Sequence, residues 1–164
     1  MRALKETGWI NFRMRAMLVS FLTYNLDQDW RDGVYHMAKL FLDYEPGIHY
    51  TQFQMQAGVT GINSIRIYNP IKQSKDHDPD GIFIKKWVDE LANIPSEFVH
   101  EPWLMTDLDR SFYQINAKFN VPSIDIINAS KLARKKIWSH RSDDIVKKEN
   151  LRLIKKHTRN FKSI

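Results

Sequence analysis

The chain has 164 residues, of which 43% are hydrophobic and 12% aromatic, so it is long enough and apolar enough to fold around a core. It contains no cysteine, which excludes disulfides, thiolate metal sites and cysteine nucleophiles and is compatible with a reducing cytoplasm. No apolar run approaches the roughly 20 residues of a membrane span, and the N-terminus lacks a signal-peptide pattern. We therefore expect a cytoplasmic protein without membrane contact.

The net charge of +6 is concentrated near the C-terminus. Residues 1–128 contain 13 Lys/Arg against 16 Asp/Glu, a net charge of −3, whereas residues 129–164 contain 12 against 3, a net charge of +9. This asymmetry divides the chain into a body, residues 1–128, and a basic tail, residues 129–164. The tail could bind nucleic-acid phosphates by counterion release, and a solvated helical face is an equally good interpretation.

Apolar side chains recur at the three- and four-residue spacing of an amphipathic helix over residues 10–26 and again over residues 30–42. Asp29 stands directly before the second segment and is a candidate N-cap. The Pro-Gly pair at residues 46–47 is expected to stop the second helix or its extension. Residues 48–57 could form a further short helix.

The aspartates of residues 76–81 superficially resemble the start of a calcium-binding EF-hand loop, but Trp87 stands where the ligand glutamate is needed. We expect these aspartates to fix a turn and cap a helix at about residues 82–91. The tail predicts two helices, residues 129–141 and 143–160. No strand pattern is long enough to build a sheet, so the predicted fold is an all-α irregular helical bundle.

Arg15 lies at the border of the first apolar stripe, on the helical face of Asn11 and Leu18. Because an unpaired charge is costly to bury, this arginine needs a carboxylate partner. Asp43 and Glu45 follow the second predicted helix, and we predict an ion pair between Arg15 and Asp43. By themselves these residues indicate either a clamp between two helices or a binding site at an irregular turn.

Asp43, Glu45 and His49 do not form a convincing metal site, because neither a third carboxylate nor a His-x-x-x-His spacing accompanies them. We therefore expect no metal. His49 alone is more often a structural histidine than a catalyst. Tryptophans such as Trp30 are ordinarily core residues in a small helical domain.

The order of these motifs resembles the C-terminal half of the FAD-binding helical domain of the cryptochrome/DNA photolyase family, over about residues 1–103. The segment from Gly8 to Arg15 is similar to the family's Gly-Trp-x-x-x-Arg-x-Arg helix, and residues 43–45 to its flavin-site turn. Arg66-Ile-Tyr-Asn-Pro70 and His100-Glu-Pro-Trp103 extend the match. The resemblance implies FAD as the cofactor, bound by Arg15, Asp43, Tyr44, Glu45 and His49.

The resemblance also implies roles in the chemistry. Trp30 falls on the middle tryptophan of the family's electron-transfer chain, and His49 falls near the residue that faces the flavin N5 atom. These two are the candidate catalytic residues. The region that meets the DNA lesion in photolyases corresponds to Asn11, Phe12 and Arg13.

The chain departs from the family pattern in several places. The α/β antenna domain and the first part of the helical domain, which holds the FAD phosphates, have no counterpart. Photolyases commonly have asparagine where Phe12 stands. No tryptophan occupies the flavin-proximal relay position, for which Tyr50 or Phe53 would be imperfect replacements. We expect a truncated, split or divergent member, with an upstream-half partner chain or self-association.

The leading interpretation is a photolyase-like FAD-binding domain that uses light-driven electron transfer from flavin to repair pyrimidine dimers in DNA. If active, it would be a deoxyribodipyrimidine photo-lyase. One alternative is a cryptochrome-type blue-light sensor that binds FAD without repair. Another is a non-catalytic helical fragment that binds DNA or a partner through its basic tail.

Overall fold

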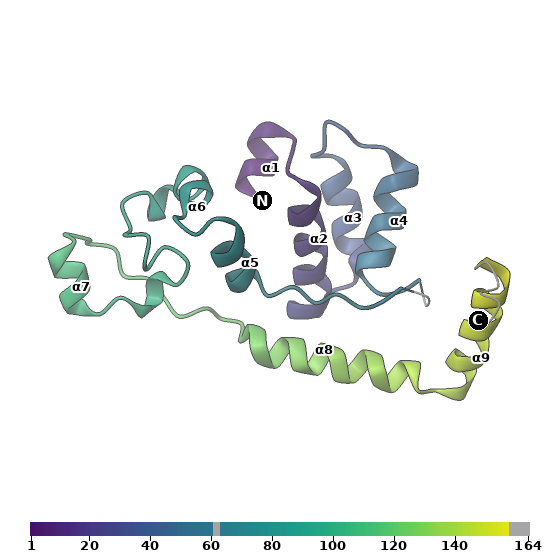
Figure 1. Ribbon diagram of the computed structural model, residues 1–164. Coiled ribbons are helices and arrows are strands. Elements are labelled where there is room, and N and C mark those ends of the chain that lie inside the picture. Colours follow the sequence, from purple (N-terminus) through teal and green to yellow (C-terminus); the bar gives the residue numbers. More distant parts are fainter. Residues whose placement is uncertain (61–62, 158–164) are drawn as a thin grey trace, which may run out of the picture.

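The structure, a computed structural model, describes residues 1–60 and 63–157 and is helical without strands over those residues, as predicted (Figure 1). The first four helices form a bundle, α5 to α7 form a lobe beside it, and the long helix α8 runs along the lower edge of the bundle. No helix of this part is long and apolar enough to cross a membrane. The helices are α1 (Arg2–Thr7), α2 (Phe12–Ser20), α3 (Trp30–Ala38), α4 (Pro46–Gln56), α5 (Pro70–His77), α6 (Ile82–Trp87), α7 (Asp107–Phe112), α8 (Ile126–Arg141) and α9 (Asp144–His157).

The predicted helix over residues 10–26 is present, but in two segments of different winding. Asn11 caps α2 by accepting a hydrogen bond from the Met14 amide at 3.0 Å. After α2 the chain widens into a π-helical turn, Phe21–Asn25, in which the Leu26 amide donates to the Phe21 carbonyl five residues back. The turn buries Tyr24, whose hydroxyl donates to the Gln56 carbonyl at 2.8 Å. This bond ties the end of α2 to the end of α4.

The second predicted helix begins as expected and ends early. Asp29 caps α3 by accepting from the Arg31 amide at 2.8 Å, and α3 ends at Ala38. The prediction that the Pro-Gly pair stops this helix is wrong, because Pro46 is the first residue of α4. Proline suits that position because its missing N–H is not needed there, and the Glu45 carboxylate accepts from the next two amides. The short helix predicted at residues 48–57 is confirmed as α4.

The main core lies between the first four helices. The chain reverses after α1 at Gly8, which has φ 67° and whose carbonyl accepts from the Leu42 amide at 3.0 Å. This contact brings the start of α2 next to the segment that follows α3, and so places Arg15 beside Asp43. The helix α1 was not predicted. The buried core side chains include Leu4, Ile10, Val19, Val34, Met37, Phe41 and Phe53.

The lobe of α5 to α7 has a smaller core around Ile94, Val99 and Met105. Asp78 caps α6 as expected, because its carboxylate accepts from the Phe83 and Ile84 amides, each at 3.0 Å. The helix itself is shorter than predicted and continues as a 3-10 turn, Asp89–Leu91. Neither α5 nor α7 was predicted, although Thr106 and Asp109 form a capping box at the start of α7.

The two predicted tail helices are present as α8 and α9. They meet at residues 142–144, where the Asp143 carboxylate accepts from the Ile145 amide at 2.8 Å. Since α8 begins at Ile126, the proposed division after residue 128 falls inside a continuous helix. The last residues of the second predicted tail helix, 158–160, lie outside the described residues.

Candidate functional site

The predicted ion pair between Arg15 and Asp43 is confirmed. Nη2 of Arg15 lies 2.8 and 3.0 Å from the two carboxylate oxygens of Asp43. Nε of Arg15 donates to the Ile10 carbonyl at 2.9 Å, and the guanidinium carbon lies 4.1 Å from the centroid of the Phe41 ring. The arginine is thus held in one orientation by contacts before α2 and after α3. Such a fixed cation can position a ligand as well as join two helices.

The Arg15 guanidinium, hydrogen-bonded to Asp43, lowers the pKa of that carboxyl below its ordinary value of 3.8. A lowered pKa means that the pair stabilises the fold fully above the ordinary pKa and loses this contribution as the pH falls through the folded-state pKa. Because the Asp43 side chain is 51% exposed, we expect Asp43→Asn to reduce the free energy of unfolding by only about 1 kcal/mol at neutral pH. Urea unfolding across pH measures this. A difference from wild type that persists undiminished in strong acid would contradict it.

A pocket of about 150 Å³ lies between α2, α4 and the turn that joins α3 to α4. Its walls are mostly apolar, and its outer edge includes the exposed side chains of Phe12 and Ile48. The pocket brings together most of the residues predicted for the site. These are Phe12, Arg15, Asp43, Tyr44, Glu45 and His49.

His49 is buried in the wall of this pocket. Its Nε2 lies 2.9 Å from the Val34 carbonyl, a contact in which the ring nitrogen must donate. The ring also packs against Phe53 and Tyr44, with centroids 4.7 and 5.4 Å apart. The hydrogen bond and the ring contacts fix the orientation of the imidazole. The orientation of Glu45 is likewise fixed. Its carboxylate caps α4, and the residue also lines the pocket.

Gln52 is a site residue that the sequence prediction missed. It lines the pocket, and its Oε1 is buried without a hydrogen-bond partner. Buried polar atoms nearly always have a partner, so this acceptor requires a donor from water or a ligand. A flavin offers such donors in its imide N–H and its ribityl hydroxyls, and the pocket therefore fits part of an FAD molecule. The available signal was the spacing of His49, Gln52 and Gln56, which share one face of a helix.

Trp30 is not in this pocket. It is buried, its Nε1 has no hydrogen-bond partner, and it lines a separate groove of about 900 Å³ between the bundle and the two tail helices α8 and α9. The Arg31 guanidinium lies 4.8 Å from its ring centroid, whereas none of the aromatic ring pairs within the described residues includes Trp30. The tryptophan relay that the resemblance implies thus has no ring-to-ring contact through Trp30 in this part of the chain.

The three residues expected to meet DNA lie together at the start of α2 but in different roles. Asn11 uses its side-chain oxygen to cap the helix, Phe12 is 59% exposed at the edge of the pocket, and Arg13 is exposed.

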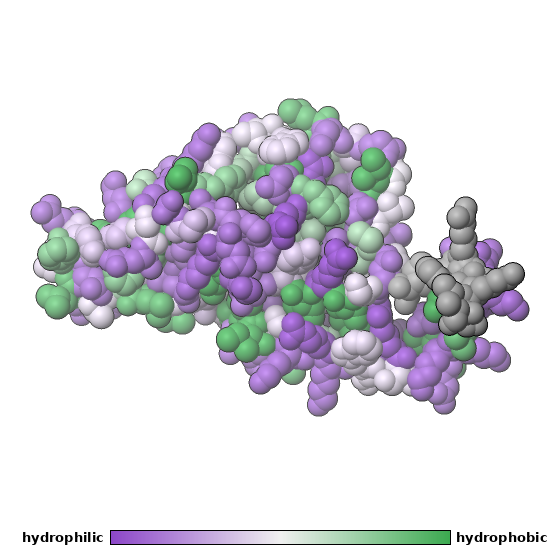
Figure 2. Space-filling view, in the orientation of Figure 1, coloured by the Kyte–Doolittle hydropathy of each residue, from purple (hydrophilic) through white to green (hydrophobic). Residues whose placement is uncertain are grey.

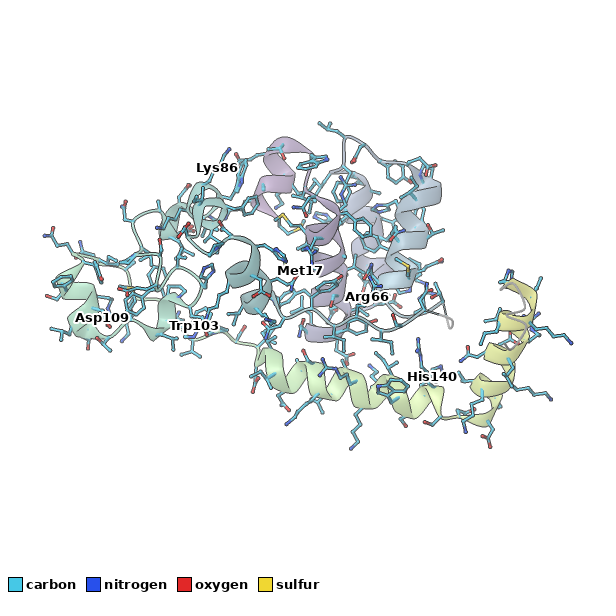
Figure 3. The ribbon with its side chains drawn as sticks, viewed as in Figure 1. Met17, Arg66, Lys86, Trp103, Asp109 and His140 are labelled. Atoms are coloured by element: carbon cyan, nitrogen blue, oxygen red, sulfur yellow. The ribbon has the colours of Figure 1, made fainter. Side chains whose placement is uncertain are left out.

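Within residues 1–60 and 63–157, no three His, Asp or Glu side chains gather in a way that could hold a metal ion. Trp103, from a motif of the resemblance, lies in the lobe at the left of Figure 3, away from α2 and α4.

The family model for the FAD binding domain of DNA photolyase matches residues 1–139. The deoxyribodipyrimidine photo-lyase of Alkalihalophilus pseudofirmus is 33% identical over 146 residues, which are 88% of this chain and 30% of that protein. Cryptochrome DASH of Gloeobacter violaceus is 31% identical over 146 residues, which are 85% of this chain and 29% of that protein. The chain therefore belongs to the cryptochrome/photolyase family, as an FAD-binding helical domain.

Solved structures of this family have the same fold. A Synechocystis cryptochrome superposes with a TM-score of 0.73 at 29% identity, over 82% of this chain and 29% of that one. A class III photolyase from Agrobacterium tumefaciens superposes with a TM-score of 0.74 at 26% identity, over 90% of this chain and 30% of that one. The chain thus spans about 30% of the length of the relatives that it matches.

Proposed function

We propose that the pocket between α2 and α4 forms one wall of an FAD site, and that this protein uses the bound flavin to repair pyrimidine dimers in DNA under light. The observation that carries the proposal is the unpartnered Oε1 of Gln52 in the same pocket as the Arg15–Asp43 pair. The Gln52 oxygen needs a hydrogen-bond donor, and the Arg15–Asp43 pair presents fixed charge in the same pocket. A flavin could satisfy both.

When bound and reduced, the flavin supplies the electron that splits the dimer under light. The protein's part is to bind, orient and exclude water. In the proposed arrangement Arg15 and Asp43 hold the polar side of the cofactor, and Gln52 accepts a hydrogen bond from it. His49 and Tyr44 give the flavin a rigid aromatic wall. In the same arrangement the exposed ring of Phe12, at the edge of the pocket, would contact a base extruded from the duplex.

A second candidate function is blue-light sensing without repair. Photolyases and cryptochromes match this chain at nearly equal identity, 33% and 31% for the two relatives above. Both kinds of protein would use the same FAD wall. They differ in whether a light-exposed complex removes dimers from DNA.

The test is a chimera in which residues 1–139 replace the matching segment of the Alkalihalophilus pseudofirmus photolyase. We expect the purified chimera to hold flavin and to repair dimers under blue light. In the chimera, Gln52→Leu should weaken flavin binding by roughly 3- to 10-fold, because one hydrogen bond is lost. Gln73→Leu is the matched control, since Gln73 also has a buried, unpartnered Oε1 but lies on α5, outside the pocket.

Three outcomes count against the proposal or against the repair activity in it. A chimera that folds but carries no flavin would show that these residues do not form the wall of the site. Equal effects of Gln52→Leu and Gln73→Leu would remove the role given to Gln52. A chimera that holds flavin but repairs nothing under light would favour the sensor.

A further inference from the structure

The long helix α8 has one side fixed against the bundle. Its half-buried side chains Ala129, Ala133 and Ile137 recur at the spacing of one helical face. Ser130, beside them, accepts a hydrogen bond from the Asn25 side chain at 3.3 Å. The apolar side of α8 therefore faces the bundle, where Ala133 and Ile137 line the groove described above, and the opposite side is turned to solvent.

That solvent side carries Lys131, Arg134, Lys135 and Trp138, which we name the outer stripe. All four are exposed, and they share one side of the helix because each lies three or four residues from two of the others. Among the described residues none of the three cations forms an ion pair. By contrast, Lys136 on the flank of α8 pairs with Asp27 at 2.7 Å. The outer stripe is thus a row of cations whose charge this part of the molecule does not neutralise.

The same excess of positive charge continues along α9. Lys148, Lys155 and Lys156 are exposed and make no ion pair within the described part of the chain. The lower edge of the molecule, where α8 runs, shows hydrophilic side chains with a few apolar ones among them (Figure 2). This edge lies opposite the turn between α3 and α4, which carries Asp43 (Figure 1). The basic surface and the pocket are therefore at different ends of the bundle.

We infer that the outer stripe is a second, sequence-independent contact for the phosphate backbone of duplex DNA. This extends the proposed function, because it adds to the pocket a contact that reads neither base nor lesion. Closely spaced lysines and arginines without acidic partners gain most from a polyanion, since binding releases its condensed counterions. The exposed indole of Trp138 can rest on a sugar or base edge beside them. Phosphate contacts of this kind hold the protein on the duplex without specifying a sequence.

A membrane surface is the less suitable partner for this helix. Helices that lie in a bilayer interface bury an apolar face in the lipid. The apolar face of α8 is turned towards the π-helical turn of the bundle and the groove beside it. The exposed apolar side chains of α8, which are Ile127, Leu132 and Trp138, lie among the cations and do not form a separate apolar face.

The experiment measures binding of the full chain to an undamaged duplex of about 20 base pairs by fluorescence anisotropy, between about 50 and 200 mM salt. The variant is Lys131→Ala/Arg134→Ala/Lys135→Ala. If each cation neutralises one phosphate, the slope of log K against log salt should become less negative by about 2.7. The ratio of wild-type to variant affinity should then shrink by about 40-fold across this salt range.

A charge-matched control is Lys5→Ala/Lys39→Ala/Lys118→Ala, which removes the same charge from exposed positions outside the tail. It should keep a slope close to that of wild type. Lys131→Arg/Lys135→Arg should also keep it, because the positive charge remains. The duplex is undamaged and no flavin is added, so a failure of the flavin proposal would not alter this result. Circular dichroism checks that each variant keeps its helices.

Three results would overturn the inference. The stripe variant and the charge-matched control could lose affinity and slope equally, which would make the effect one of net charge alone. The stripe variant could keep the wild-type slope. The wild-type chain could bind phosphatidylserine vesicles and not the duplex, which would assign the surface to a membrane.

Discussion

Residues 1–164 purified alone should carry little or no flavin and should bind added FAD more weakly than about 10 µM, which is less than about 7 kcal/mol of binding free energy. The pocket measures about 150 Å³, whereas sites for smaller organic ligands usually measure about 300–1,000 Å³ and bury most of the ligand surface. A single wall leaves most of the FAD in water. Quenching of FAD fluorescence during titration with the protein measures the affinity.

The chimera described above is the positive control, because it presents the same wall together with the rest of a relative's site. A yellow protein with nearly one flavin per chain, obtained from residues 1–164 alone, would show that this wall is sufficient. The remaining question would then be how so shallow a pocket retains the cofactor.

Phe53→Ala should lower the free energy of unfolding by about 3–5 kcal/mol, a large share of the roughly 5–15 kcal/mol that holds a typical domain folded. Phe53 is 3% exposed, belongs to the main core and packs against the His49 ring. Phe53 also lines the pocket, so its loss would extend the pocket into the core and free the imidazole to turn. Urea denaturation followed by circular dichroism measures the change.

The matched control is Phe112→Ala, the same substitution at a side chain that is 77% exposed. Surface changes of this kind usually stay within about 0.5 kcal/mol. If the two variants unfold at the same urea concentration, Phe53 is not the core residue that its burial indicates. Loss of flavin from the Phe53→Ala chimera without loss of stability would point instead to a direct contact with the cofactor.

Helical periodicity predicted the helices that bury a regular face, and it failed for those that depend on distant contacts. The segments that became α2 and α3 carry repeated apolar positions, whereas the segment that became α4 alternates polar and aromatic residues. The helix α1 has six residues, too few to be stable alone, and it is held by the burial of Leu4 in the main core. Local sequence cannot report that burial.

The Pro-Gly pair at residues 46–47 shows why one signal can have two outcomes. Proline ends a helix when it interrupts the hydrogen bonds of a turn, and it begins one when its own N–H is not required. Glu45 decided the outcome here, because its carboxylate caps the helix that follows. Reading the acid together with the proline would have predicted the start of α4.

The candidate site was predictable where charge imposed a requirement. Arg15 needed an acid, and Asp43 follows the second predicted helix, which packs against the helix of Arg15. Gln52 carried no such requirement, because a neutral amide can be left on a surface at little cost. Trp30 was assigned to the electron path by resemblance, and its position in a separate groove depends on how α3 faces α8. The orientation of α3 relative to α8 is determined by the packing of the helices and cannot be predicted from the local sequence.

The π-helical turn at residues 21–25 has a consequence for how this segment tolerates insertions and deletions. Such a turn is an α-helix that has accommodated one additional residue. Removing a residue there would let the helix continue with ordinary winding, but everything on one side would rotate by about 100° relative to the other. The Tyr24 hydroxyl would then lose its hydrogen bond to the Gln56 carbonyl. The additional residue is therefore required for the contact between the end of α2 and the end of α4. A deletion at this point would break that contact although the sequences of both helices had not changed.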